Sequence, residues 1–356
     1  MYTPFEKRAM ELALREALKG GKAVFPNPMV GAVILNAGGD VVSSGHHACC
    51  GAPHAERDAL SKAGDVRGMT MVVTLEPCCH HGRTPPCAEA LAEAGIKRVV
   101  AAMVDPDPQV SGRGIEYLRS RGVDVSTGLM EEAARDLNRV YLHHRETGRS
   151  FLHLKMAGTL DGMCAAADGS SRWITGPVSR KTVHGFRRDA HAVLIGAGTA
   201  LADDPSLVVS EVECHPADQP VRIVLTGEDL REGLRMFTLP GRTVVACDRP
   251  VKAHPSAEMW TGIASPGELL KRTAEEGLGL VLCEGGPVLA ASLVRARLVD
   301  RLSIFTSPSL LGGEGRPIFG ELGIPGIDGM LRLKDVTVRE SGEDMLTEGR
   351  IVYRAD

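Results

Sequence analysis

Residues 53–87 constrain this chain more than any other stretch, because metal-ligand side chains are concentrated there. The stretch contains His54, Glu56, Cys78 and Cys87. One imidazole and two thiolates make a three-ligand zinc set, which leaves a tetrahedral ion one open position for water. A carboxylate two residues after the histidine is suited to general acid/base work on that water. The stretch therefore predicts a catalytic zinc centre held by His54, Cys78 and Cys87, with Glu56 as the acid/base.

The spacing of these residues predicts where they lie in the fold. Residues two apart point to different sides of a mid-helix, so His54 and Glu56 converge only at a helix start, where Pro53 suits the first helical position. Residues 69–75 (MTMVVTL) predict a buried strand, and Cys78 follows its end. Open α/β sheets keep their active sites at the carboxyl ends of parallel strands. We therefore expect the metal at such an edge, beside two helix starts.

The order of the four residues resembles the zinc deaminase signature, H-x-E followed by Pro-Cys and a second cysteine. Here the second cysteine lies nine positions after the first instead of three, so a loop is inserted between them. A structural zinc or a buried core histidine is the alternative, and it would explain an isolated H-x-E. The two downstream cysteines favour the catalytic interpretation.

The composition limits the class of protein. A chain of 356 residues exceeds a usual single domain and suggests two. The net charge of -4 and the 4% aromatic content disfavour a nucleic-acid surface. Residues 1–19 predict an amphipathic helix rather than a signal peptide, and no apolar run is long enough to span a membrane. Nine cysteines without a secretory signal indicate a reducing cytoplasm and metal chemistry rather than a disulfide framework.

The periodicity divides the chain into two α/β domains, residues 1–146 and 147–356. The first is expected to run helix, hairpin, helix, strand, helix. It then continues with strands at 96–105 and 123–127 and helices at 114–121 and 131–145. In the second domain, helical segments separate strand-like runs at 151–156, 191–195, 221–225, 243–246, 278–283 and 302–306.

Several motifs together resemble the bifunctional riboflavin-biosynthesis deaminase/reductase family, a branch of the cytidine deaminase superfamily. The deaminase motifs are PHAE (53–56), EPC (76–78) and HGRTPPC (81–87). The reductase motifs are KMAGTLDG (155–162), SRWITG (171–176), GAGTALADDP (196–205) and EGGP (284–287). The resemblance covers nearly the whole chain. It implies an N-terminal cytidine-deaminase-like αβα domain followed by a dihydrofolate-reductase-like α/β domain.

The resemblance implies two successive steps on one pyrimidine. The first is hydrolytic deamination of 2,5-diamino-6-(5-phosphoribosylamino)pyrimidin-4-one, and the second is reduction of the ribose chain to ribityl. The implied cofactors are one Zn²⁺ per chain and NADPH. The implied partner is a small-molecule substrate, and no binding to nucleic acid or to a membrane is expected. A cytoplasmic homo-oligomer is also implied. On general chemistry, zinc lowers the pKa of bound water toward about 7. Glu56 would then move protons to the ring nitrogen and the departing ammonia.

The resemblance also assigns further residues of the deaminase site. Arg83, a forked permanent cation, would bind the substrate phosphate, unless it is a solvated surface charge. Cys49, Cys50 and Cys79 are expected to be bystanders, because a fourth protein ligand would close the open metal position. The residues implied to line the deaminase substrate site are Asn27, His47, His80, Arg83 and Thr84.

Two glycine turns mark the second site. Gly285-Gly286 follows the strand at 278–283, and 196–199 (GAGT) follows the strand at 191–195, so backbone N–H groups can approach a phosphate. Neither turn is GxGxxG, so a Rossmann fingerprint is not predicted. The glycine turn places Gly285 and Gly286 at the nicotinamide nucleotide, and the resemblance implies that Ala157, Trp173, Thr199 and Asp203 also bind it; a core position is the alternative for Trp173. By resemblance, the reductase substrate residues are Lys155, Asp161, Ser171, Arg187, Leu207 and Glu284.

Two positions depart from the family pattern. Ser210 stands where an arginine usually reaches the substrate phosphate, so Arg187 would act alone or Arg222 would compensate; Met163 stands where a basic residue is common. Three other functions stay open. The C-terminal domain could be a non-catalytic binding or oligomerisation module. The chain could deaminate nucleic acid, or it could be a non-enzymatic interaction protein with a structural zinc site.

Overall fold

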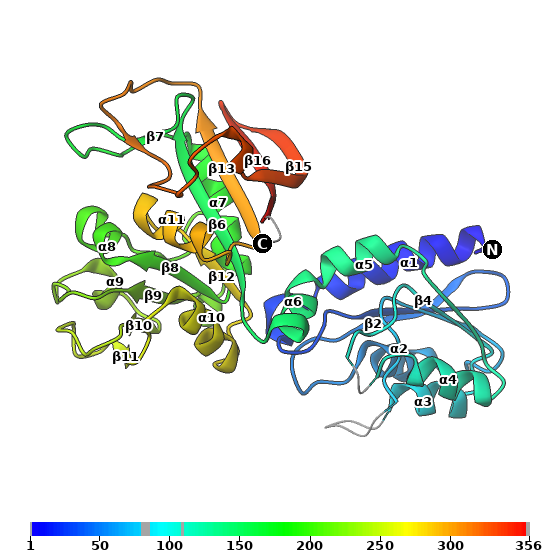
Figure 1. The fold of residues 1–356 in the computed structure, drawn as a ribbon. Coiled ribbons are helices and arrows are strands. Elements are labelled where there is room, and N and C mark those ends of the chain that lie inside the picture. The colour runs from blue at the N-terminus through cyan, green and yellow to red at the C-terminus, as the bar shows by residue number, and fades with distance from the viewer. Residues whose placement is uncertain (1, 80–85, 108–109, 354–356) are drawn as a thin grey trace. The chain divides into compact units, whose positions relative to one another are not determined.

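The computed structural model describes residues 2–79, 86–107 and 110–353 (Figure 1). The chain folds as two compact units, Met1–Gly148 and Arg149–Asp356. Within the described residues, no helix is long and apolar enough to cross a membrane. Each unit is an α/β layer structure built on its own sheet.

The first unit is organised around a five-stranded sheet with the order β2-β1-β3-β4-β5. β1 pairs antiparallel with β2 and β3, whereas β3, β4 and β5 run parallel. Every residue of β1 is buried, as expected for a strand covered on both faces. The strands are β1 (Gly31–Leu35), β2 (Val41–His46), β3 (Thr70–Val73), β4 (Arg98–Ala101) and β5 (Asp124–Thr127).

The helices of the first unit confirm the expected order of helix, hairpin, helix, strand and helix. A capping box between Thr3 and Glu6 and a proline at the first position start α1. The helices are α1 (Pro4–Leu18), a short 3₁₀ turn (Gly21–Val24), α2 (Ala55–Ala63), α3 (Cys87–Glu93), α4 (Arg113–Ser120), α5 (Glu131–Leu137) and α6 (Arg139–Thr147).

Two local expectations were wrong. The helix expected from Pro53 begins at Ala55 with His54 as its N-cap, so the proline lies before the cap. The helix expected over 131–145 is two helices that meet at Asn138. The Asn138 side chain accepts a hydrogen bond from the Met29 N–H (2.8 Å) and donates one to the Met29 carbonyl (3.0 Å). This buried amide therefore ties the α5–α6 junction to the loop before β1.

The second unit contains a nine-stranded sheet with the order β11-β10-β9-β8-β12-β6-β13-β16-β15. It is parallel from β11 to β13, and β16 and β15 add an antiparallel edge. The strands are β6 (Phe151–Thr159), β8 (Ala192–Gly196), β9 (Val221–Leu225), β10 (Thr243–Ala246), β11 (Glu258–Trp260), β12 (Leu280–Cys283), β13 (Arg301–Ser307), β15 (Arg332–Ser341) and β16 (Asp344–Val352), with β7 (Met163–Ala165) and β14 (Arg316–Pro317) as a separate pair.

The six strands expected in this unit are confirmed, and the β15–β16 hairpin was missed. Most of β15 is exposed, so it lacks the buried alternation that marks a strand in sequence. The remaining helical elements are α7 (Pro177–Asp189), α8 (Ala197–Asp203), α9 (Arg235–Thr238), α10 (Pro266–Glu275), α11 (Pro287–Arg295) and 3₁₀ turns at Pro216–Asp218 and Ile327–Gly329. α8 and α11 begin where β8 and β12 end, so two helix starts meet at one sheet edge.

Candidate active sites

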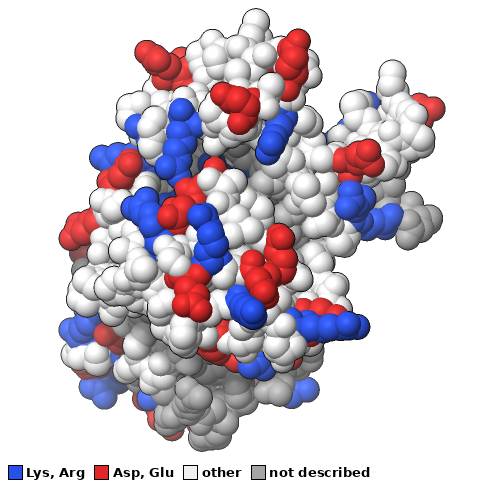
Figure 2. Space-filling view, turned by 90° about the vertical axis from the view of Figure 1, so that its left-hand side faces the viewer, with Lys and Arg blue, Asp and Glu red and all other residues white. Residues whose placement is uncertain are grey.

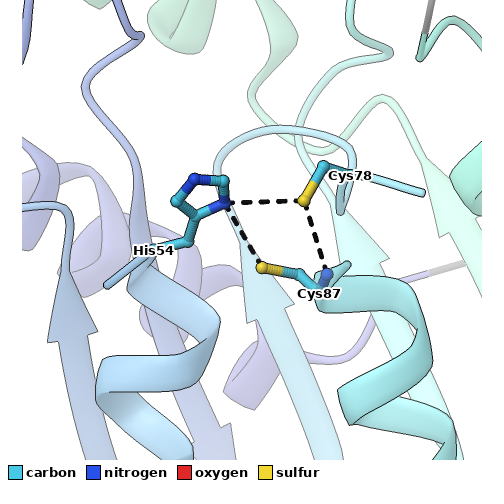
Figure 3. A group of neighbouring side chains, drawn as sticks. All are labelled: His54, Cys78 and Cys87. Carbon is cyan, nitrogen blue, oxygen red and sulfur yellow. Dashed lines mark hydrogen bonds between the residues drawn. The ribbon is translucent and has the colours of Figure 1, made fainter. Parts of the chain in front are cut away.

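The three expected metal ligands come together in the first unit (Figure 3). The His54 Nδ1 atom lies 3.5 Å from Cys78 Sγ and 3.4 Å from Cys87 Sγ. All three ligand atoms lie within 4.8 Å of one another. A tetrahedral zinc ion with ordinary Zn–N and Zn–S bonds would separate nitrogen from sulfur by about 3.6 Å, so the donor set fits zinc.

Local structure explains why these side chains converge. His54 caps α2, Cys87 opens α3, and Cys78 follows β3 at the carboxyl end of the parallel strands. The Cys87 N–H donates to Cys78 Sγ (3.4 Å), so a helix start faces the thiolate. Hydrogen bonds from the Cys87 thiol and from His54 lower the pKa of Cys78 to about 4 against its burial. A thiolate is the form that binds metal.

Glu56 lies in the first turn of α2 and is only 3% exposed. Burial, together with the Cys78 thiolate, raises the pKa of Glu56 to about 7. A carboxylate whose pKa is close to neutral can both accept and return a proton, as a general acid/base requires. Glu56 and two of the ligands, His54 and Cys78, line one cavity of about 450 Å³, a size typical of small-molecule sites.

Asn27 and His47, both expected at the substrate site, form one hydrogen-bonded chain beside this cavity. Asn27 Nδ2 lies 3.1 Å from His47 Nε2, and His47 Nδ1 lies 3.1 Å from the Pro53 carbonyl oxygen. The carbonyl can only accept, so His47 carries its proton on Nδ1 and accepts from Asn27 on Nε2. Burial lowers the pKa of His47, which favours this neutral form. The remaining residues expected here, His80, Arg83 and Thr84, lie outside the described residues.

The sequence did not predict the acidic side of the cavity, which is lined by Glu76, Asp105 and Asp107. Glu76 is buried, and its carboxylate accepts hydrogen bonds from the N–H groups of Asp105, Gly112, Gly114 and Ile115. Glu76 thereby ties the end of β3 to the loop after β4. The signal available in the sequence was an acidic residue just after each of two adjacent parallel strands.

Asp105 and Tyr141 form the next contact along that side. The Tyr141 hydroxyl donates to Asp105 Oδ1 (3.0 Å), and the Asp107 N–H donates to the same oxygen (2.9 Å). Burial raises the pKa of Asp105 to about 6. One turn further along α6, Arg145 forms an ion pair with Asp107. These four residues all line the cavity that holds Glu56.

The second site is a charged cluster where β12 ends. Arg187 of α7 forms a two-pronged ion pair with Glu284, with Nε–Oε1 at 2.5 Å and Nη2–Oε2 at 2.9 Å. Its remaining nitrogen donates to the Val208 carbonyl (3.1 Å). Burial opposes the charge of Glu284, but Arg187 and Lys155 lower its pKa below the usual value. Burial lowers the pKa of Lys155, whose ammonium lies 5.9 Å from the Phe305 ring centroid.

The two glycine turns lie side by side. The Gly286 N–H donates to Thr199 Oγ1 (3.0 Å), which joins the start of α11 to α8. A Cβ on Gly285 would lie 2.7 Å from the end of the Leu289 side chain, so a larger residue there would make that side chain shift. The Ser171 hydroxyl lies 3.5 Å from Asp203 Oδ1. Thr199, Asp203, Ser171 and the Gly-Gly turn are therefore linked through α8.

The other residues expected at the second site occupy varied environments. Ala157 packs beside Phe305, and Asp161 is exposed and accepts hydrogen bonds from Leu311 and Gly312. The Leu207 side chain is buried in a hydrophobic cluster. Trp173 is 71% exposed, with the Arg180 guanidinium 4.5 Å from its ring centroid. The core alternative for Trp173 was therefore wrong.

Arg222 does not compensate for Ser210. It is 2% exposed and donates to Thr243 Oγ1 (2.9 Å) and to the carbonyls of Leu239 and Gly241. Thr243 begins β10, so this guanidinium is held at the amino-terminal side of the strands. The other departing residue, Met163, lies in β7, apart from the main sheet.

Comparisons with known proteins give a family match for each unit. Residues 4–103 match the family described as the cytidine and deoxycytidylate deaminase zinc-binding region. Residues 150–347 match the family described as the RibD C-terminal domain. The two matches correspond to the two units of the fold.

Similar full-length proteins span the whole chain. Riboflavin biosynthesis protein RibD of Aquifex aeolicus is 40% identical over 355 residues, covering 97% of this chain and 98% of that protein. RibD of Escherichia coli is 38% identical over 363 residues, covering 94% and 96%.

Solved structures show the same architecture. A diaminohydroxyphosphoribosylaminopyrimidine deaminase/5-amino-6-(5-phosphoribosylamino)uracil reductase from Thermotoga maritima gives a TM-score of 0.88 at 34% identity, covering 98% of this chain and 99% of that one. RibD of Acinetobacter baumannii gives 0.87 at 33%, with the same coverage. The chain therefore belongs to the RibD family of riboflavin biosynthesis proteins, and it is a bifunctional enzyme with a zinc-dependent deaminase domain and an NADPH-dependent reductase domain.

Proposed function

We propose that residues 1–146 deaminate 2,5-diamino-6-(5-phosphoribosylamino)pyrimidin-4-one and that residues 147–356 reduce the ribose chain of the product to ribityl. The observation that carries this proposal is the convergence of His54, Cys78 and Cys87 beside a buried Glu56 in one cavity. The substrate identity is supported by the activity for which the similar Thermotoga protein is named.

In the deaminase step, His54, Cys78 and Cys87 would hold zinc. Bound zinc supplies Lewis acidity, which makes water a nucleophile near neutral pH. Glu56 accepts a proton from the attacking water at its carboxylate and delivers it to the ring nitrogen. It then accepts the second proton, from the hydroxyl group added to the ring carbon, and delivers it to the amine as the carbon–nitrogen bond breaks. Its pKa of about 7 allows both transfers. Asn27, oriented by the neutral His47, presents its amide to the ring.

In the reductase step, NADPH supplies the hydride when bound. Thr199, Asp203, Gly285 and Gly286 line the turns proposed for the nucleotide, with Ala157 and the exposed Trp173 as further contacts. The substrate would meet Lys155, Glu284 and Arg187, with Asp161, Ser171 and Leu207 around them. Because all three Arg187 nitrogens already have partners, contact with a phosphate would share this guanidinium with Glu284.

The decisive experiment combines metal analysis with an ammonia assay on the phosphoribosylaminopyrimidine, with and without NADPH. We expect about one zinc per chain, ammonia release without NADPH, and NADPH oxidation only after deamination. Glu56→Gln should retain zinc and lose nearly all ammonia release. Parent-like ammonia release by Glu56→Gln would contradict the assigned role.

The same proposal places the enzyme in the cytoplasm as a homo-oligomer. None of the nine cysteines, all of which lie in the described residues, forms a disulfide, and a reducing compartment keeps the zinc thiols available. The exposed edge strand β15 presents Val336 and Val338, which a second copy could cover. Light scattering after size exclusion measures the assembly. Lys and Arg side chains are interspersed with Asp and Glu on the face in Figure 2, which gives no support to a nucleic-acid substrate.

A further inference from the structure

The deaminase cavity contains a guanidinium that the zinc chemistry does not use. Arg145 lines the same cavity as Glu56, and it comes from α6, at the far end of the domain sequence. Tyr141 lies one turn earlier on the same helix face, and its ring centroid is 6.0 Å from the Arg145 guanidinium. The helix therefore presents two side chains to the cavity.

Charge makes this residue distinctive. Four carboxylates line the cavity, those of Glu56, Glu76, Asp105 and Asp107, whereas Arg145 is the one lysine or arginine among its described lining residues. An anionic substrate arm would be repelled by such a wall unless a cation met it. A guanidinium is also the group that binds phosphate with two parallel hydrogen bonds.

The exposed fractions of the cavity residues indicate which part of the substrate would meet Arg145. Glu56 is 3% exposed, so the reacting ring must lie at the bottom of the cavity. The Arg145 side chain is 38% exposed, whereas its partner Asp107 is 13% exposed. Arg145 therefore lies toward the mouth, where an arm attached to the ring would emerge, and Asp107 holds it from behind.

We propose that Arg145 binds the phosphate of the deaminase substrate, with Asp107 positioning its guanidinium. This inference rests on the proposed deamination of a phosphoribosylaminopyrimidine. The test compares KM for that substrate with KM for its riboside, which lacks the phosphate. Arg145→Gln should raise KM for the phosphorylated substrate about 10- to 100-fold, the loss expected for hydrogen bonds to a charged group. KM for the riboside and kcat for both substrates should stay unchanged.

Matched variants separate phosphate binding from other roles. Arg139→Gln removes an exposed arginine from the same helix and should behave as the parent. Arg145→Lys should recover part of the affinity. The double variant Arg145→Gln/Asp107→Asn should keep the raised KM. Recovery of the parental KM in that double variant would show that Arg145 only neutralises Asp107, and it would overturn the proposal.

Binding can be measured without turnover. In a Glu56→Gln background without NADPH, isothermal titration measures the affinity for the phosphorylated substrate directly. Replacing Arg145 in this background should lower that affinity by the same factor as it raises KM. Equal affinities, or equal KM increases for both substrates, would refute the role of Arg145 and leave the deaminase assignment intact. Absence of ammonia release from the zinc-loaded parent would instead refute the proposed function. Zinc content and circular dichroism verify that each variant folds.

Discussion

The stability of the Asp105→Asn variant, compared with that of the parent, should rise as the pH rises. Burial raises the pKa of Asp105 to about 6 from the ordinary 3.8. The folded protein thus binds this proton more tightly than the unfolded chain. The stability that Asp105 contributes is complete below pH 3.8 and is lost as pH rises through about 6. Asparagine has no such dependence, and it retains an oxygen that can accept from Tyr141.

The magnitude follows from the interval between the two pKa values. At about 1.4 kcal/mol per pH unit, it corresponds to about 3 kcal/mol in total. The parent loses about half of this contribution between about pH 5 and about pH 8. The unfolding free energy of the variant should therefore rise by about 1.4 kcal/mol relative to that of the parent across this range.

The assay is urea unfolding at both pH values with zinc in excess. Circular dichroism follows the whole chain, whereas Trp173 and Trp260, the two tryptophans, lie in the second unit. Tryptophan fluorescence is therefore an internal control that Asp105→Asn should not shift. The exposed Asp136→Asn is a matched substitution, expected to stay within about 0.5 kcal/mol. A stability difference that is identical at both pH values would refute the burial argument.

Four other substitutions test individual contacts. Cys87→Ser should lose zinc by elemental analysis, whereas Cys79→Ser should keep it, because only Cys87 belongs to the ligand cluster. Glu284→Gln leaves Arg187, whose side chain is only 14% exposed, without its counter-charge. This change should destabilise the second unit by about 3 kcal/mol or more, measured by tryptophan fluorescence; parent-like stability would contradict the pairing. Glu76→Gln replaces one acceptor oxygen that serves two backbone N–H groups and should cost about 2–4 kcal/mol in urea unfolding. A loss below about 0.5 kcal/mol would mean that water replaces those contacts.

Much of the fold was predictable because it depends on local patterns. Strands such as β9 and β10 are short apolar runs between turn residues, and the structure has them at the expected positions. The convergence of His54, Cys78 and Cys87 was predictable too, because residues at helix starts and after a parallel strand meet at one sheet edge. The exposed β15 was missed because nothing buried marks its pattern.

The amino-acid sequence alone determined the order of the two domains and was enough to predict the metal ligands and the acid/base residue, since each prediction depends on residue type and near-neighbour spacing. Tertiary structure decided which distant side chains complete the cavity. Tyr141 meets Asp105 across 36 positions, and Arg187 meets Glu284 across 97. No periodicity specifies such pairs, because they depend on how the strands and helices pack together. The alternative that Arg222 compensates for Ser210 was wrong for the same reason: its position next to a strand start was visible in the sequence, but its carbonyl partners were not.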